Sequence, residues 1–236
     1  MSSVTDSVNF VTDKILIAPQ GYKNTWNVGY STSQADDQAL IDSILTKLET
    51  YDNVDTRDIT FIGYGVGGQL ASQYFIQTQK TNLKNLVLIS SLLHFDQHKV
   101  TYDSQNNRVD TFYSLTLNPL QAEDSTQMIW SAVTPLSGRN YLMFNGTNNL
   151  DWPYTGGIAN GLELKSAQDT IYAWAKAEND IADQLTSGAI QPGGETLYSY
   201  KNGALRLFAY DGVGSNFGEY LTLSLIHISE PTRLAI

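Results

Sequence analysis

The chain has 236 residues, of which 14 are basic and 24 acidic, giving a formal net charge of −10 at pH 7. This length suits a single α/β domain, and the acidic balance supplies no basic patch for the phosphates of a nucleic acid. Cysteine is absent, which excludes disulfides and thiolate catalysis, and no apolar run reaches the roughly 20 residues of a membrane-spanning helix. We therefore expect neither nucleic acid nor membrane among the partners.

The first expected unit is a strand followed by a helix. Residues 14–19 (Lys-Ile-Leu-Ile-Ala-Pro) form a short apolar run closed by proline, which is typical of a strand buried in a parallel sheet. Residues 36–51 predict a helix, because two aspartates suit its positive N-terminal end and apolar residues recur at helical spacing.

The next segment, residues 59–69, reads Ile-Thr-Phe-Ile-Gly-Tyr-Gly-Val-Gly-Gly-Gln and predicts a strand, a sharp turn and a helix. In the nucleophile elbow G-x-S-x-G, a serine occupies the apex of such a turn and flanking glycines admit close backbone approach. Here the flanking glycines are Gly63 and Gly67, and the apex is Gly65. The sequence therefore predicts an elbow without a nucleophile.

Apolar runs and amphipathic stretches continue to alternate after the elbow. The expected elements are a helix at 68–79, strands at 85–90 and 141–144, a helix at 166–179, and a hairpin of strands 196–200 and 204–210. This alternation favours the α/β class, with a mostly parallel sheet covered by helices on both faces.

Three further expectations concern the organisation of the chain. Residues 92–137 have a weaker pattern, which we interpret as loops and short helices forming a cap-like insertion. Residues 1–222 are expected to form one domain, and residues 223–236 resemble translated adaptor sequence, a non-native tail. Residues 1–10 have neither the cationic nor the apolar region of a secretory signal, so the chain as written predicts a cytoplasmic protein, with its compartment left open.

Six sequence marks in chain order carry a resemblance to a known family. They are Ile-Ala-Pro-Gln-Gly at 17–21, Trp-Asn-Val-Gly at 26–29, Asp-Asp at 36–37, Asp-Thr-Arg-Asp at 55–58, Gly-Thr-Asn-Asn at 146–149 with Trp-Pro-Tyr-Thr-Gly-Gly at 152–157, and Gly-Val-Gly-Ser at 212–215. With these marks the chain resembles the polyhydroxybutyrate depolymerase and feruloyl esterase branch of the α/β-hydrolases. The resemblance implies an α/β-hydrolase fold that lacks its first strands.

The resemblance also assigns the catalytic positions. Such enzymes use serine, aspartate and histidine in that chain order, and the matching positions here hold Gly65, Asn149 and Ser215. Loss of a whole triad costs on the order of 10⁶ in kcat. The backbone N–H of Val66 would remain as one donor of the oxyanion hole, and the loop expected to give the other donor precedes residue 14 in the family.

We therefore expect a pseudoenzyme, a catalytically impaired relative of serine esterases acting on carboxylic esters, which keeps a ligand-binding cleft and needs no cofactor. The alternative is an active carboxylic-ester hydrolase that uses non-standard residues. Four residues on loops at one end of the sheet could bind an ester or an aromatic or sugar-like ligand, or the aromatic ones could simply cover the core: Trp26, Asn27, Trp152 and Tyr154. The oligomeric state stays open.

Substitute catalytic groups were sought among the remaining polar residues. His94 and His98 have the spacing of a zinc-binding pair on a helix but lack a third ligand, so we expect solvated loop histidines and no metal. Ser90 and Ser91 lie close by in the sequence. Asp151 could replace the orienting carboxylate, although a surface acid is the simpler interpretation.

Overall fold

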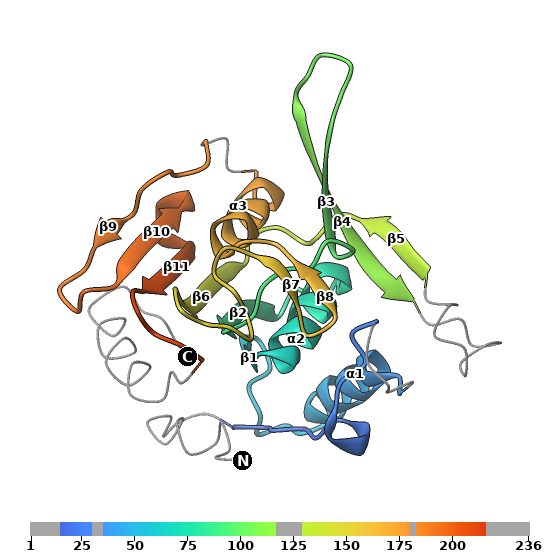
Figure 1. Cartoon of the computed structure of the whole chain (residues 1–236). Helices are drawn as coiled ribbons and strands as arrows, with labels where there is room; N and C mark the ends of the chain where they lie inside the picture. The colour runs from blue at the N-terminus through green and yellow to red at the C-terminus, as the bar shows by residue number, and fades with distance from the viewer. Residues whose placement is uncertain (1–14, 30–34, 117–128, 180–182, 216–236) are drawn as a thin grey trace.

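The computed structural model describes residues 15–29, 35–116, 129–179 and 183–215. Its centre is a six-stranded mixed sheet with the order β1-β2-β6-β11-β10-β9 (Figure 1). The strands are β1 (Ile59–Tyr64), β2 (Leu83–Ile89), β6 (Asn140–Gly146), β11 (Leu205–Tyr210), β10 (Thr196–Tyr200) and β9 (Ala189–Ile190). The first four in this order run parallel, β10 pairs antiparallel with β11, and β9 pairs antiparallel with β10. The expected α/β class with mostly parallel strands is confirmed.

The helices of the described residues begin at local sequence signals. They are α1 (Asp37–Leu48), α2 (Val66–Gln77) and α3 (Ala167–Ala177), with short 3₁₀ turns η2 (Tyr22–Asn24) and η4 (Lys201–Gly203). The Asp36 carboxylate accepts from Ala39 N at 2.9 Å, and the Ser166 hydroxyl accepts from Asp169 N at 3.0 Å. Both side chains satisfy helix N–H groups that would otherwise lack partners. The expected helices and the C-terminal hairpin are confirmed, with ends shifted by a few residues.

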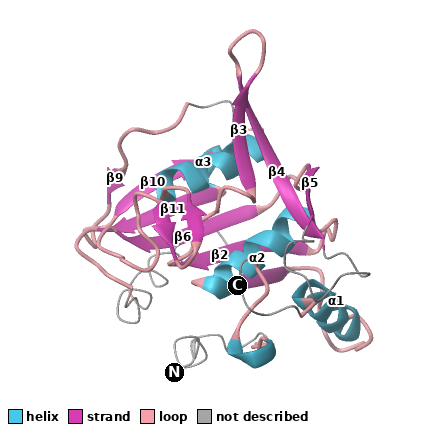
Figure 2. Cartoon of the chain, turned by 45° about the vertical axis from the view of Figure 1, so that its right-hand side comes forward, coloured by secondary structure: helices cyan, strands magenta, loops and turns pink. Residues whose placement is uncertain are grey.

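The two faces of the sheet are covered differently. On one face, α2 and α3 pack over the strands (Figure 2), and their buried side chains share one large core with Leu88, Met143 and Leu207. The other face carries a smaller cluster of Ile89, Phe144, Phe208, Tyr210 and Val213, to which no helical residue of the described chain belongs. The expectation of helices on both faces is therefore not met within the described residues.

Residues 15–20 do not form the expected strand (Figure 1). Ile15, Leu16 and Ile17 are 62%, 51% and 41% exposed. A parallel strand exists only where a neighbouring strand supplies hydrogen-bond partners, and the sheet ends at β1 among the described residues. An apolar run of this length therefore misled the prediction, because its pattern cannot show whether a neighbour is present.

The interpretation of residues 92–137 as loops and short helices is wrong for the described residues. They form an antiparallel sheet of β3 (His98–Tyr102), β4 (Arg108–Thr116) and β5 (Ile129–Val133), and the β3–β4 hairpin projects from the body (Figure 1). β4 is rich in β-branched and aromatic residues, a composition that favours strands. A two-stranded sheet joins β7 (Gly157–Ala159) to β8 (Leu162–Leu164).

One expectation falls outside what the structure describes. The tail at 223–236 lies beyond the described residues. Within the described chain, no helix combines the length and apolarity needed to cross a membrane.

Candidate functional site

Gly65 forms a sharp turn between β1 and α2. Its φ of +52° and ψ of −122° lie in a region that residues with a Cβ rarely adopt. The Gly65 N–H donates to Ile89 O at 3.1 Å, and its carbonyl accepts from Gly68 N at 3.0 Å and Gln69 N at 3.2 Å. These bonds fix the turn to the end of β2 on one side and to the first turn of α2 on the other.

The flanking glycines differ in how much space they leave. A Cβ on Gly63 would lie 2.4 Å from Gly68 Cα, whereas a Cβ on Gly67 would meet only Trp26 Nε1 at 3.7 Å. The strand and the helix therefore approach so closely at Gly63 that only glycine fits. This is the packing that an elbow turn requires, and it confirms the expected strand, turn and helix.

The backbone N–H of Val66 is the first of α2 and has no hydrogen-bond partner among the described residues. An unpaired amide at a helix N-terminus can donate to an oxyanion. The residue expected as an oxyanion donor therefore retains that capacity.

Asn149 shapes the loop that follows β6. Its side-chain Oδ1 accepts from Asp151 N at 3.1 Å and from Trp152 N at 3.0 Å, and the residue is 2% exposed. The loop carries the indole of Trp152 over the elbow, because a Cβ on Gly65 would lie 3.1 Å from Trp152 Nε1. Asn149 thus organises a loop that closes the space above the apex.

Ser215 returns to the same edge of the sheet. The Tyr64 hydroxyl, one residue before the apex, donates to the Ser215 carbonyl at 2.9 Å. The loops after β6 and β11 are also joined, since the Thr147 hydroxyl donates to Asp211 at 3.0 Å and Asn148 N donates to Val213 O at 3.1 Å. The structure therefore brings the loops of all three triad-matching positions together at the carboxyl ends of β1, β6 and β11.

Asn27 ties its loop to α1. Its backbone N–H donates to Asp37 Oδ2 at 2.5 Å, its side-chain amide donates to Ala35 O at 3.0 Å, and its Oδ1 accepts from Gly29 N at 3.3 Å. Burial raises the pKa of Asp37 above its ordinary value, and the hydrogen bond from Asn27 opposes that shift. Both polar ends of the Asn27 side chain are thus used within the protein.

The aromatic candidates behave mainly as cover for the core. Trp152 is 4% exposed and belongs to the large core, and Trp26 and Tyr154 pack against it while partly buried. The Tyr154 hydroxyl accepts from Gln168 Nε2 at 3.1 Å, and burial raises its pKa. Of the two interpretations of these residues, the geometry favours the core edge, and a role in binding stays a prediction.

The histidines contradict the expectation of solvated loop residues, because His94 and His98 are 1% and 0% exposed. Burial lowers the pKa of His94 to about 3, and burial also lowers the pKa of His98 although its contact with Asp110 opposes this. His94 stacks edge-on against Trp130 at 5.3 Å between ring centres. The prediction failed because the flanking polar residues suggested a loop, whereas the segment joins two sheets through the core.

An ionic cluster that the sequence did not reveal adjoins the buried His98. Its Nε2 lies 2.9 Å from Asp110 Oδ1, and Arg108 contacts both oxygens of Asp110 at 2.7 Å. Burial alone would raise the pKa of Asp110, but the hydrogen bonds from His98 and Arg108 lower it well below its usual range. Recognising β4 as a strand, paired with β3, would have placed these residues side by side.

Neither set of substitute groups forms a relay on the described residues. Ser90 and Ser91 are 0% and 1% exposed, so a substrate cannot reach them, and Asp151 is an exposed loop acid. No group of three or more histidines and acids in the described chain could hold a metal ion.

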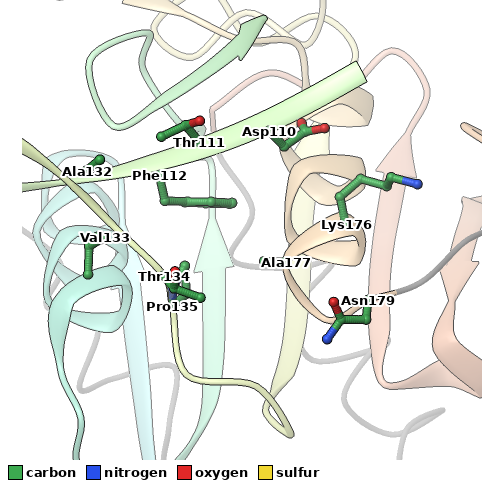
Figure 3. Close-up of a pocket in the computed structure, with 10 residues that line it drawn as sticks. All are labelled: Asp110, Thr111, Phe112, Ala132, Val133, Thr134, Pro135, Lys176, Ala177 and Asn179. Carbon is green, nitrogen blue, oxygen red and sulfur yellow. The ribbon is translucent and has the colours of Figure 1, made fainter. Parts of the chain in front are cut away.

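One cavity lined by described residues lies away from the elbow. It has a volume of about 380 Å³ and opens between β4, β5 and the last turn of α3 (Figure 3). The lining residues are Asp110, Thr111, Phe112, Ala132, Val133, Thr134, Pro135, Lys176, Ala177 and Asn179. None of these lining residues belongs to the elbow.

Fold and site together define an α/β protein with a mixed sheet and an elbow turn that lacks a nucleophile. Comparisons with protein-family models, with curated proteins and with solved structures found no match.

Proposed function

We propose that this chain is a catalytically impaired relative of serine esterases, with the scaffold of the polyhydroxybutyrate depolymerase and feruloyl esterase-like branch of the α/β-hydrolases. The observation that carries the proposal is the elbow itself, where Gly65 takes a positive φ at the apex and Gly63 packs on Gly68. Glycine has no atom with which to attack an ester, so a hydrolase cycle cannot begin at this apex.

The order of the strands supports the same scaffold. The residues at 65, 149 and 215 follow three strands of one parallel block, in the chain order in which α/β-hydrolases carry serine, acid and histidine. Because carboxyl ends of parallel strands share one edge, loops from distant parts of the chain can meet there. In this proposal the residues at 65, 149 and 215 remove the reacting groups, and the packing of the turn stays intact.

The proposal does not place a ligand directly above the apex. Trp152 occupies that space, and Asn149 holds the Trp152 backbone in position. The predicted ester, aromatic or sugar-like ligand would have to displace the indole or bind beside it. Non-hydrolytic function is thus proposed for the elbow, and ligand binding there stays a prediction.

An active hydrolase with non-standard residues is the alternative, and no described contact favours it. It would need a reachable serine beside a histidine, whereas Ser90, Ser91, His94 and His98 are all buried. A neutral, buried histidine can accept a proton only from a group it touches.

The direct test is to incubate the purified full chain with a short-chain aryl ester and, separately, with a fluorophosphonate probe. We expect turnover equal to that of a heat-denatured sample and no covalent adduct by intact mass. Turnover above that control, or an adduct mapped by peptide mass to any serine, would overturn the proposal.

A further inference from the structure

The cavity between β4, β5 and α3 has the dimensions of a small-molecule site. Its volume of about 380 Å³ lies within the range of roughly 300 to 1,000 Å³ usual for ligand pockets. Phe112 and Pro135 are buried at its wall, and Phe112 is held by the Trp174 ring at 4.6 Å. Part of the lining is therefore apolar and fixed by the core.

The charged groups at the cavity differ in whether they are already paired. Both oxygens of Asp110 are occupied, one by His98 and Arg108 and the other by Arg108. The Lys176 ammonium, by contrast, has no ion pair within the described chain and lies 5.6 Å from the centre of the Tyr172 ring. A ligand would therefore meet a free ammonium group rather than a free carboxylate.

The charged groups nearest Lys176 do not cancel its charge. The Arg108 guanidinium lies 4.7 Å from the centre of the same Tyr172 ring. Two cations thus share one aromatic ring, and only Arg108 has a carboxylate partner. The Arg108–Asp110 pair is neutral as a whole, so the Lys176 ammonium is the group at the cavity that would attract an anion. The carbonyl end of α3 opposes an anion, so binding should depend on the Lys176 ammonium.

We propose that this cavity binds a small organic anion with a flat apolar body, with Lys176 pairing with its charge at the rim (Figure 3). The apolar body would lie against Val133 and Phe112, and the Lys176 side chain extends outward from α3 at the edge of the cavity. The proposal is independent of the esterase scaffold, since it uses no residue of the elbow.

The test uses 2-naphthoate as the anion and 2-naphthalenemethanol as its neutral analogue, titrated into the full chain by calorimetry. We expect saturable binding of 2-naphthoate with Kd on the order of 1 mM, a value suited to a ligand of its size. The neutral analogue should bind at least about threefold more weakly. Equal binding of the two compounds, or no saturable binding of 2-naphthoate, would overturn the proposal.

The charge contribution is isolated with a matched pair of variants. Lys176→Gln should weaken 2-naphthoate about three- to fivefold and leave the neutral analogue unchanged. Lys47→Gln is the control, because Lys47 also lies in the last turn of a helix, beside a tyrosine ring at 5.1 Å, and away from the cavity. Equal weakening by both variants would show a general charge effect and contradict a site at Lys176.

Occupancy of the cavity is tested at Ala132, which is exposed on β5 and lines the cavity. Ala132→Trp should weaken 2-naphthoate at least tenfold by filling the space. In methyl-labelled protein, the ligand should shift the Ala132 and Ala177 signals and leave the buried Ala71 of α2 unchanged. Unchanged affinity of Ala132→Trp, or shifts confined to Ala71 and its surroundings, would contradict the proposed location.

Discussion

The elbow and the β3–β4–β5 sheet differ in which features of a catalytic centre they have: the elbow has the backbone geometry, and the sheet has the ionisable side chains. At the elbow the backbone geometry is present, with Gly65 at positive φ and an unpaired N–H on Val66, but no ionisable side chain stands at the triad positions. In the antiparallel sheet His98 contacts Asp110, as in a proton relay, but His98 is buried and Asp110 is already held by Arg108. The turn geometry and the ionisable side chains therefore lie in different parts of this protein, and catalysis of this kind would need both at one site.

The largest expected effect is the loss of unfolding free energy at low pH that is caused by the buried His94. Burial lowers the pKa of folded His94 from 6.5 to about 3, so between these values the unfolded chain binds a proton that the folded chain does not. The stability that depends on neutral His94 is then fully present above pH 6.5 and is lost as the pH falls toward 3. From pH 6.5 to 4 we expect a loss of about 3 kcal/mol from this group.

The measurement is urea unfolding at several pH values in the wild type and in His94→Gln. The variant should show a shallower decline of unfolding free energy below pH 6.5, with the remaining slope containing the contribution of His98, whose pKa is also lowered. Identical slopes in the two proteins would mean that His94 is not buried in its neutral form.

The next effect tests the close approach at the elbow. In Gly63→Ala the new Cβ would lie 2.4 Å from the Gly68 backbone, which cannot move as a side chain could. We expect a loss of about 2.5 kcal/mol of unfolding free energy. Gly67→Ala is the control, where the new Cβ meets Trp26 at an ordinary 3.7 Å, and equal losses in both variants would argue against a tight strand–helix contact.

A somewhat smaller effect is expected at the apex. Gly65→Ser forces a residue with a Cβ into a φ of +52° and brings that atom to 3.1 Å from the Trp152 indole. We expect a loss of about 2 kcal/mol, measured by urea unfolding. Adding Trp152→Phe should recover the part caused by the contact, while Gly67→Ser should leave stability nearly unchanged. No loss in Gly65→Ser would show that the turn is not strained.

The smallest effect is expected when the triad is restored. The combined variant Gly65→Ser, Asn149→Asp and Ser215→His should raise aryl ester hydrolysis by less than about tenfold, because Trp152 covers the apex and small misplacements of reacting groups cost about 10² in rate. Initial rates would be compared with those of the matched Gly67→Ser, Asn149→Asp and Ser215→His variant. Activity at the level of a working esterase would show that the second oxyanion donor is present after all.

Much of the fold followed from local sequence. The elbow was predicted from glycines at 63, 65 and 67 between an apolar run and an amphipathic one, and α3 from its Ser166 cap and its apolar stripe. These signals depend only on residues that are adjacent in the chain, so they can be recognised from the sequence alone. The assignment of positions 65, 149 and 215 to a degenerate triad rests on the resemblance and stays a prediction.

The tertiary structure decided what those local signals could not. Residues 15–20 have the composition of a strand but remain exposed, whereas His94 and His98 have the sequence context of loop residues but lie in the core. Trp152 lies over Gly65 because Asn149 holds the loop that carries it. Each outcome depends on a partner distant in the chain: a neighbouring strand, a covering sheet, or the opposite end of a loop. Burial and pairing are properties of those long-range contacts, whereas a turn and a helix cap are encoded within a few adjacent residues.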